Sequence, residues 1–167
     1  MFTIVPNTDN QFTAVRAIAF EVWPKTYGSI LTPAQIEYML DKMYSVTSLQ
    51  EQANQKKHHF ILVREGNETV GFASYEHHAE ASEKTKIHKI YVLSSQQGKG
   101  TGKALVNFIA NEAKAKGDKV LFLNVNKYNS AIHFYQKIGF VIAKEEVIDI
   151  GNGFVMDDYV MEKGIKS

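Results

Sequence analysis

Hydrophobic and polar positions repeat with two different periods along this chain, and these periods predict where helices and strands lie. In the first third, apolar residues recur at the three- and four-residue spacing of amphipathic helices. The expected elements are a short strand and three helices, over residues 2–5, 9–22, 32–43 and 48–57. Their starts are marked by Asp9, by Thr32 with Pro33, and by a capping box at Ser48–Glu51. The Trp-Pro sequence within 23–28 should end the first helix.

From residue 59 onward the two-residue period of β-strands dominates. The expected strands cover 59–64, 69–76, 87–93, 119–125, 141–150 and 154–162. Glycine and asparagine at 65–68 and at 151–153 predict two hairpin turns. Between the third and fourth strands, residues 103–116 carry the apolar stripe of a helix, which Gly117 ends.

Composition bounds the class of protein. A chain of 167 residues with 44% hydrophobic content fits one domain, residues 1–167, with a full core. Its 19 basic and 18 acidic residues leave a formal net charge of +1, which gives no electrostatic reason to expect nucleic acid or a membrane as partner. The absence of cysteine excludes disulfides, thiolate metal sites and an acyl-cysteine intermediate, and no metal site is predicted. Without a signal-peptide pattern or a membrane-spanning apolar run, we expect a cytoplasmic location.

A glycine-rich turn follows the strand at 87–93. It reads Gln97-Gly98-Lys99-Gly100-Thr101-Gly102-Lys103, and a helical pattern begins directly behind it. Closely spaced glycines and a helix N-terminus suit a phosphate or pyrophosphate, although a surface turn without ligand is the plain alternative. A Walker A loop does not fit, because the spacing before Gly102 is too short and alanine follows Lys103. A dinucleotide fingerprint fits poorly, because Asp118 precedes the next strand instead of ending it.

The pattern Gln97-x-x-Gly100-x-Gly102 resembles the Q/R-x-x-G-x-G/A signature of the GNAT superfamily of N-acetyltransferases. The stretch from Asn126 to Phe140 is similar to that family's second signature, a short helix with Asn and Tyr that ends in Gly-Phe. The resemblance covers about residues 60 to 163. It implies an α/β (α+β) GNAT fold, with a mixed, mostly antiparallel sheet of six to seven strands, splayed at its centre, and four or five helices on both faces.

The same resemblance implies acetyl-CoA as the cofactor. The expected contacts are Ile90, Tyr91, Val92, all residues from Gln97 to Lys103, Asn126, Asn129, Ala131 and Phe134. Main-chain groups of 90–92 would bond the pantetheine arm as an added strand, and the glycine-rich turn would grip the pyrophosphate. Capping of the following helix is an equal alternative for Asn129.

Two residues are expected to be catalytic. By the resemblance, Tyr135 lies beside the thioester sulfur, where its hydroxyl would stabilise the departing thiolate; the plain alternative is packing. His88 shares a strand face with Ile90 and Val92 and occupies a position where the family often has a glutamate that acts as a base through water. With an ordinary pKa of about 6.5, histidine can accept a proton at neutral pH. A structural, hydrogen-bonded histidine is the equal alternative, and in that case water or a backbone carbonyl would take the proton of the amine.

The acceptor is less defined. Trp23, Tyr27 and Tyr44 would line its slot or cover the core, and Glu76 and Asp157 would attract a cationic amine or be solvated. The sequence from Trp23 to Gly28 resembles the bacterial branch related to spermidine/spermine N-acetyltransferases.

The expected function is therefore acetyl transfer from acetyl-CoA to a primary amine of a small molecule, such as a polyamine, by direct attack in a ternary complex. The alternatives are a protein N-terminal or lysine acetyltransferase, and a non-catalytic acyl-CoA-binding or sensing domain. A homodimer paired through the last hairpin is compatible with the sequence.

Overall fold

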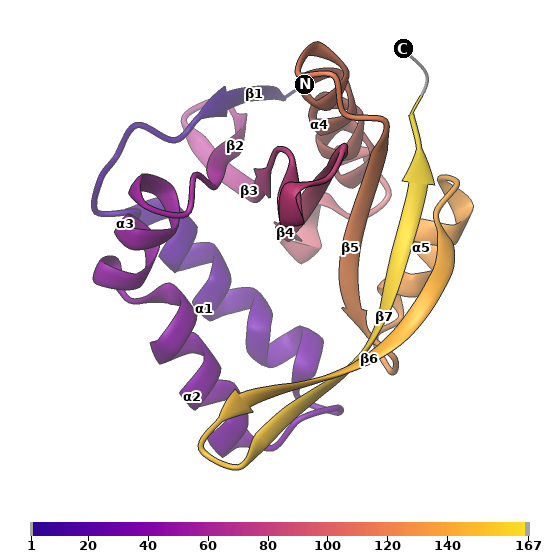
Figure 1. Ribbon diagram of the computed structural model, residues 1–167. Helices are drawn as coiled ribbons and strands as arrows, with labels where there is room; N and C mark the ends of the chain where they lie inside the picture. The colour runs from indigo at the N-terminus through magenta and orange to yellow at the C-terminus, as the bar shows by residue number, and fades with distance from the viewer. Residues whose placement is uncertain (1, 166–167) are drawn as a thin grey trace. The chain divides into compact units, whose positions relative to one another are not determined.

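The computed structural model describes residues 2–165 (Figure 1). Its α-helices and strands are, in chain order, β1 (Thr3–Pro6), α1 (Thr13–Tyr27), α2 (Pro33–Tyr44), α3 (Val46–Asn54), β2 (His59–Glu65), β3 (Glu68–Glu76), β4 (Lys84–Val92), α4 (Thr101–Ala115), β5 (Val120–Asn126), α5 (Ala131–Lys137), β6 (Val141–Gly151) and β7 (Phe154–Gly164). Two short 3₁₀-helices, η1 (Ala79–Ala81) and η2 (Ser94–Gln96), precede and follow β4.

The seven strands of the described residues form one mixed sheet in the order β1-β2-β3-β4-β5-β7-β6. β4 and β5 run parallel, whereas the β1–β2, β2–β3, β5–β7 and β6–β7 pairs are antiparallel. The predicted α+β class, with a mostly antiparallel sheet of six to seven strands and four or five helices, is confirmed.

The chain divides into two compact units, and β4 and α4 contribute residues to both. Unit 1 runs to Glu76 and resumes over Lys89–Phe108, and unit 2 contains His77–His88 and continues from Ile109. The single domain predicted over 1–167 stays a prediction, as does the splay of the sheet. Within 2–165, no helix is both long and apolar enough to cross a membrane.

In unit 1, α1 continues through Pro24, so the prediction that 23–28 breaks the helix is wrong. A proline inside a helix costs about 3 kcal/mol, because it removes one backbone hydrogen bond. Pro24 lies on the exposed side, where solvent can bond the carbonyl group that it leaves unpaired. On the inner side Trp23 and Tyr27 are buried, and burying a large side chain contributes about 1.5–3 kcal/mol each. The free energy gained by burying these two side chains is therefore at least as large as the cost of Pro24 inside the helix.

Side-chain hydrogen bonds lie at the starts of α1, α2 and α3. Thr32 caps α2 as predicted, because its hydroxyl accepts one backbone N–H at 3.1 Å. Asp9 is not the cap residue of α1, which begins at Thr13 behind Phe12; its carboxylate accepts the N–H groups of Gln11 and Thr13 at 2.9 and 3.0 Å.

The third helix begins earlier than predicted, because Ser45, not Ser48, has the extended backbone of a cap residue. It ends at Asn54, three residues before the predicted end. The Ser45 hydroxyl accepts the backbone N–H of Ser48 at 3.1 Å.

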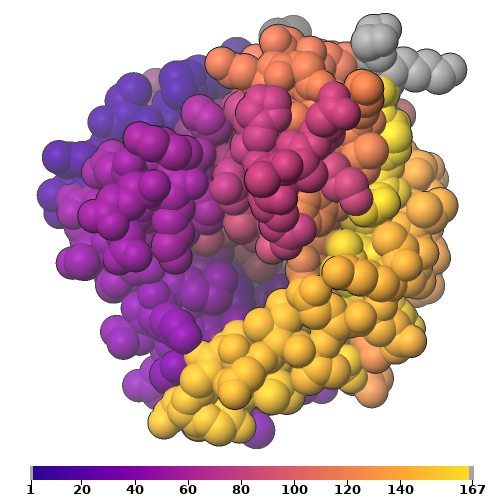
Figure 2. All heavy atoms as spheres, in the orientation of Figure 1, coloured from indigo at the N-terminus to yellow at the C-terminus, as the bar shows by residue number. Residues whose placement is uncertain are grey.

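In unit 2, β5 lies between β4 and β7. It pairs in parallel with β4 over Lys84–Ile87, and β4 begins at Lys84 instead of Ile87. Its other neighbour is β7, which pairs in turn with β6. The core of this unit contains Ile109, Ala113, Leu121, Leu123, Ile132, Tyr135, Phe140 and Met161. Most of β6 is exposed, and Figure 2 shows the gold side chains of the β6–β7 hairpin at the surface along its length.

Candidate functional site

The glycine-rich turn of unit 1 has an open backbone in a conformation that favours glycine. Gly98 and Gly100 have φ angles of 80° and 77°, which side chains of L-residues adopt only under strain. Among the described residues, apart from the two chain neighbours, no atom lies within 4 Å of the place where a Cβ would stand at either glycine. The space beside the turn therefore admits a ligand.

The first turn of α4 adds hydrogen-bond donors to this loop. The Gly100 carbonyl accepts the N–H of Ala104 at 3.0 Å, so helical bonding starts there. The N–H groups of residues 101–103 consequently have no acceptor inside the helix, and they lie at its positive end. Thr101 and Gly102 are helical, which makes the turn itself shorter than predicted.

The side chains of the turn divide into exposed and buried ones. Gln97, Lys99 and Lys103 are exposed, and Lys99 lies 3.9 Å from a Glu65 carboxylate oxygen. Gln96 is buried and accepts a 3.4 Å hydrogen bond from the hydroxyl of Thr101, which is also buried. Sequence reasoning missed Gln96, because nothing in the sequence separates it from the neighbouring motif residue.

The three aromatic residues predicted to line the acceptor slot lie together in unit 1. Trp23 is 4.5 Å from Tyr27 and 6.0 Å from Tyr44, centroid to centroid, and all three are buried. The hydroxyl of Tyr27 is 3.1 Å from that of Tyr91, whose ring also lies 6.0 Å from Trp23. Burial raises the pKa of Tyr44 far above its usual value. These rings form part of the core, and their contact with an acceptor stays a prediction.

Two further predicted sites lie in unit 1: the cofactor-binding main chain of 90–92 at the end of β4, and the acceptor-binding Glu76 at the end of β3. The main chain of 90–92 runs close to β3, because a Cβ on Gly71 would stand only 3.1 Å from the Tyr91 carbonyl oxygen. Glu76 lies 3.7 Å from Nε2 of His58. Glu76 therefore lies beside an imidazole, and its contact with an acceptor stays a prediction.

Unit 1 also contains a buried lysine that sequence reasoning did not single out. Lys89 is 5% exposed, and its Nζ donates to the side-chain oxygen of Gln52 at 2.6 Å. The ammonium group also lies over the rings of Tyr44 and Phe60, at 5.5 and 5.9 Å. The strand alternation indicated only that Lys89 faces away from His88.

In unit 2, the side chain of each motif asparagine accepts the backbone N–H of the residue two positions further along. Asn126 accepts the N–H of Tyr128, and Asn129 accepts that of Ala131, each at 2.9 Å. The second bond is the capping role that was the alternative for Asn129. Their contacts with a cofactor, and those of Ala131 and Phe134, stay predictions.

Tyr135 is buried on α5. Its ring lies 5.3 Å from Phe134 and 5.7 Å from Phe140 in edge-to-face contacts. Packing and a role for the hydroxyl are compatible here, because a buried tyrosine can pack with its ring and bond with its hydroxyl.

His88 is half-buried in the part of β4 that belongs to unit 2. The alternation predicted for this strand is observed: Thr85 and Ile87 are buried, whereas Lys86 and His88 are half-buried. The catalytic assignment of His88 stays a prediction.

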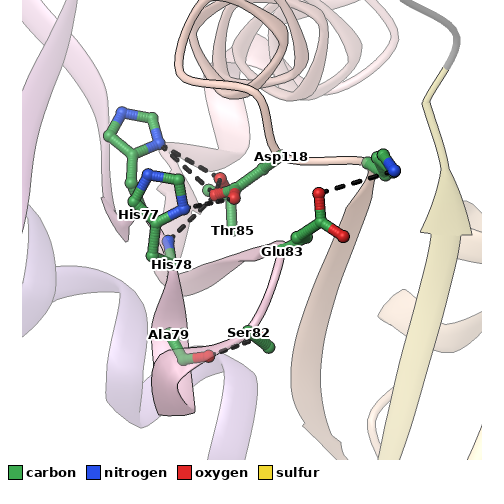
Figure 3. A network of polar contacts seen from close by, with 8 residues as sticks. His77, His78, Ala79, Ser82, Glu83, Thr85 and Asp118 are labelled. Carbon is green, nitrogen blue, oxygen red and sulfur yellow. Dashed lines mark hydrogen bonds and ion pairs between the residues drawn. The ribbon is translucent and has the colours of Figure 1, made fainter.

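A polar network that the sequence did not reveal surrounds Asp118 (Figure 3). Its carboxylate is 2.6 Å from Nδ1 of His78 and accepts the Thr85 hydroxyl at 2.7 Å and the His78 N–H at 2.9 Å. Burial alone would raise the pKa of Asp118, but these hydrogen bonds and the attraction of His78 hold it below its usual value. The network ties the 77–82 segment, where His78, Glu80 and Ala81 have positive φ, to the start of β5.

Asp157, the predicted amine-binding carboxylate, lies on β7. Its Oδ1 is 2.9 Å from Nζ of Lys127, which also pairs with Glu145. The hydrogen bonds with Glu145 and then Asp157 raise the pKa of Lys127. The neighbouring Asp158 points to the opposite face of β7 and is buried, which raises its pKa to about 6. Asp157 therefore already has a cationic partner.

Comparison with known proteins identifies the family. A family profile described as an acetyltransferase (GNAT) domain matches residues 29–163. The chain therefore belongs to the GNAT family of acetyltransferases, as the two motifs predicted.

Two individual relatives each resemble only about half of this chain. The L-amino acid N-acyltransferase MnaT of Escherichia coli is 33% identical over 89 residues, which are 51% of this chain and 52% of that protein. The [ribosomal protein bS18]-alanine N-acetyltransferase of Haemophilus influenzae is 36% identical over 76 residues, 46% of this chain and 50% of that protein. The chain thus spans about half the length of these curated relatives.

A solved structure confirms the GNAT fold. The PaiA N-acetyltransferase of Thermoplasma acidophilum, in complex with coenzyme A, matches with a TM-score of 0.81 and 23% identity, over 98% of this chain and 99% of that one. These matches do not single out the spermidine/spermine branch.

Proposed function

We propose that this protein is an acetyl-CoA-dependent N-acetyltransferase that acts on the primary amine of a small molecule. The family match over residues 29–163 carries this proposal, because it includes both the glycine-rich turn and Tyr135. Relatives named as an L-amino acid N-acyltransferase, a ribosomal-protein-alanine N-acetyltransferase and a streptothricin acetyltransferase support an amine as acceptor. A coenzyme A complex of a protein with the same fold supports the cofactor.

The turn fits a diphosphate. Gly98 and Gly100 leave open space beside the backbone, and the N–H groups of 101–103 supply donors at a positive helix end. Lys99 and Lys103 add positive charge. The main chain of 90–92 would bond the pantetheine arm in the manner of an added strand.

Tyr135 and His88 would handle the protons of the transfer. The amine nitrogen forms a bond to the acetyl carbonyl carbon, and the carbon–sulfur bond breaks. His88 would accept, through a water molecule, the proton that the amine loses. The Tyr135 hydroxyl would donate a hydrogen bond or a proton to the leaving sulfur. Because the thioester is already reactive, holding the two reactants together should supply most of the acceleration.

The acceptor class defines the alternatives. A polyamine follows from the resemblance of 23–28, whereas the ribosomal-protein relative favours a protein N-terminus. A non-catalytic acyl-CoA sensor would keep the turn and need neither His88 nor Tyr135.

The test is release of free CoA thiol from acetyl-CoA with a panel of spermidine, L-amino acids and a peptide that begins with alanine. Amine-dependent release is expected, lowered in Tyr135→Phe. Tyr128→Phe is the matched control, because Tyr128 lies in the same motif but is 74% exposed. Binding of acetyl-CoA without release for any amine would contradict the enzyme and favour the sensor.

Oligomeric state and cellular location stay predictions. β6 ends the strand order, and Val141 and Val147 on it are 63% and 66% exposed. Such an edge can pair with a second copy. Light scattering coupled to size-exclusion chromatography would measure whether it does.

A further inference from the structure

Two carboxylates lie side by side on one face of the unit 2 sheet. Asp158 on β7 and Glu146 on β6 are direct cross-strand partners, so their side chains leave the sheet on the same face. Both accept from a single amide group: Nδ2 of Asn124 lies 3.1 Å from Glu146 Oε1 and 3.3 Å from Asp158 Oδ2. One neutral donor group thus serves two acids.

The second oxygen of Asp158 lacks a donor. The residue is 5% exposed, and within residues 2–165 its Oδ1 is buried without a hydrogen-bond partner. A carboxylate offers about four acceptor positions, and an unsatisfied buried charge costs free energy. Folded proteins rarely leave such a group unpaired, and the usual partners of an apparently unpaired one are an ordered water, an ion or a ligand.

Two of the three charged groups that act on Asp158 are negative. Glu146 and Asp157 repel its negative charge, and Lys86 attracts it. The ammonium of Lys86 lies over the Phe122 ring, 5.8 Å from the centroid. The two acids share one amide group, so Asp158 Oδ1 still lacks a donor, and a positively charged donor would satisfy it best.

We propose that Asp158 and Glu146, with Asn124 between them, bind a primary ammonium group, and that this group belongs to the acetyl acceptor. The second half of the proposal rests on the proposed function. An ammonium ion has three N–H donors, enough to bond Asp158 Oδ1 and a Glu146 oxygen at once. Of the two adjacent aspartates on β7, Asp158 and not Asp157 would then select a cationic acceptor.

The test is an NMR titration of the Asn124 side-chain amide with n-butylammonium chloride at pH 7, without acetyl-CoA. A saturable shift is expected, and n-butanol, which has the same chain without the charge, should give none. Asp158→Asn and Glu146→Gln should each raise the dissociation constant at least tenfold. Glu145→Gln is the matched control, because it removes the same charge from the adjacent residue of β6, which pairs with Lys127.

The outcomes separate the site from the activity. No saturable shift, or an equal loss of binding in Glu145→Gln, would overturn the site. Amine-dependent thiol release without the Asn124 shift would keep the proposed function and refute this site. Ammonium binding without thiol release for any amine would support the site and contradict the enzyme.

Discussion

Replacing Asp158 by asparagine should stabilise the protein at neutral pH. Burial, the largest cause, raises the pKa of this carboxyl from 3.8 to about 6. A shift of about two units corresponds to about 3 kcal/mol, at 1.36 kcal/mol per unit. Because solvent still screens part of the charge, we expect Asp158→Asn to raise the free energy of unfolding by about 1–2 kcal/mol at pH 7.5.

The pH dependence gives the sign of this effect. An acid whose pKa is higher in the folded protein binds a proton more tightly there than in the unfolded chain. Its favourable contribution is complete below pH 3.8 and is lost as the pH rises to about 6. The difference in stability between variant and wild type should therefore be small at pH 4 and reach its full value above pH 6.

Urea unfolding followed by far-UV circular dichroism, at intervals from pH 4 to 8, measures this difference. Glu112→Gln is the control, because it makes the same acid-to-amide change at an exposed position of α4 and should alter stability by less than about 0.5 kcal/mol. A variant no more stable than wild type at pH 7.5, or a gain that persists unchanged at pH 4, would refute the reasoning. Added n-butylammonium should narrow the gap, because it stabilises only the wild type.

Three further predictions concern other residues. Tyr135→Phe should lower turnover about tenfold or more with acetyl-CoA affinity unchanged, measured by thiol release and calorimetry; an equal loss in Tyr128→Phe would count against it. Gly100→Ala should weaken acetyl-CoA binding, because a φ of 77° costs a side chain about 1–2 kcal/mol. Gly66→Ala carries similar strain, with a φ of 63°, and should leave the affinity in calorimetry intact. Asp118→Asn should destabilise the protein by about 2–4 kcal/mol in urea at pH 7. Because the pKa of Asp118 is lowered, this penalty should shrink as the pH falls below 3.8; a penalty that is unchanged at pH 3 would contradict the ionic role.

Much of this protein could be predicted from local sequence. The two hydrophobic periods predict every strand of the described chain and every α-helix except α5, which only the resemblance of Asn126–Phe140 to the family's second signature indicates. Gln97-x-x-Gly100-x-Gly102 indicates the family, because closely spaced glycines have a direct backbone consequence. The errors are also local. Pro24 does not end α1, and Ser45 replaces Ser48 as a cap, because packing of a helix decides its ends more strongly than propensity does.

Which polar groups become buried was decided only by tertiary structure. The alternation of a strand predicts that Asp157 and Asp158 face opposite sides, but not which side is covered. Asp157 meets Lys127, whereas Asp158 meets Asn124 and Glu146, which come from two other strands. Solvation and pairing of a charge depend on neighbours far away in the chain, and these neighbours give two identical adjacent side chains different chemistry.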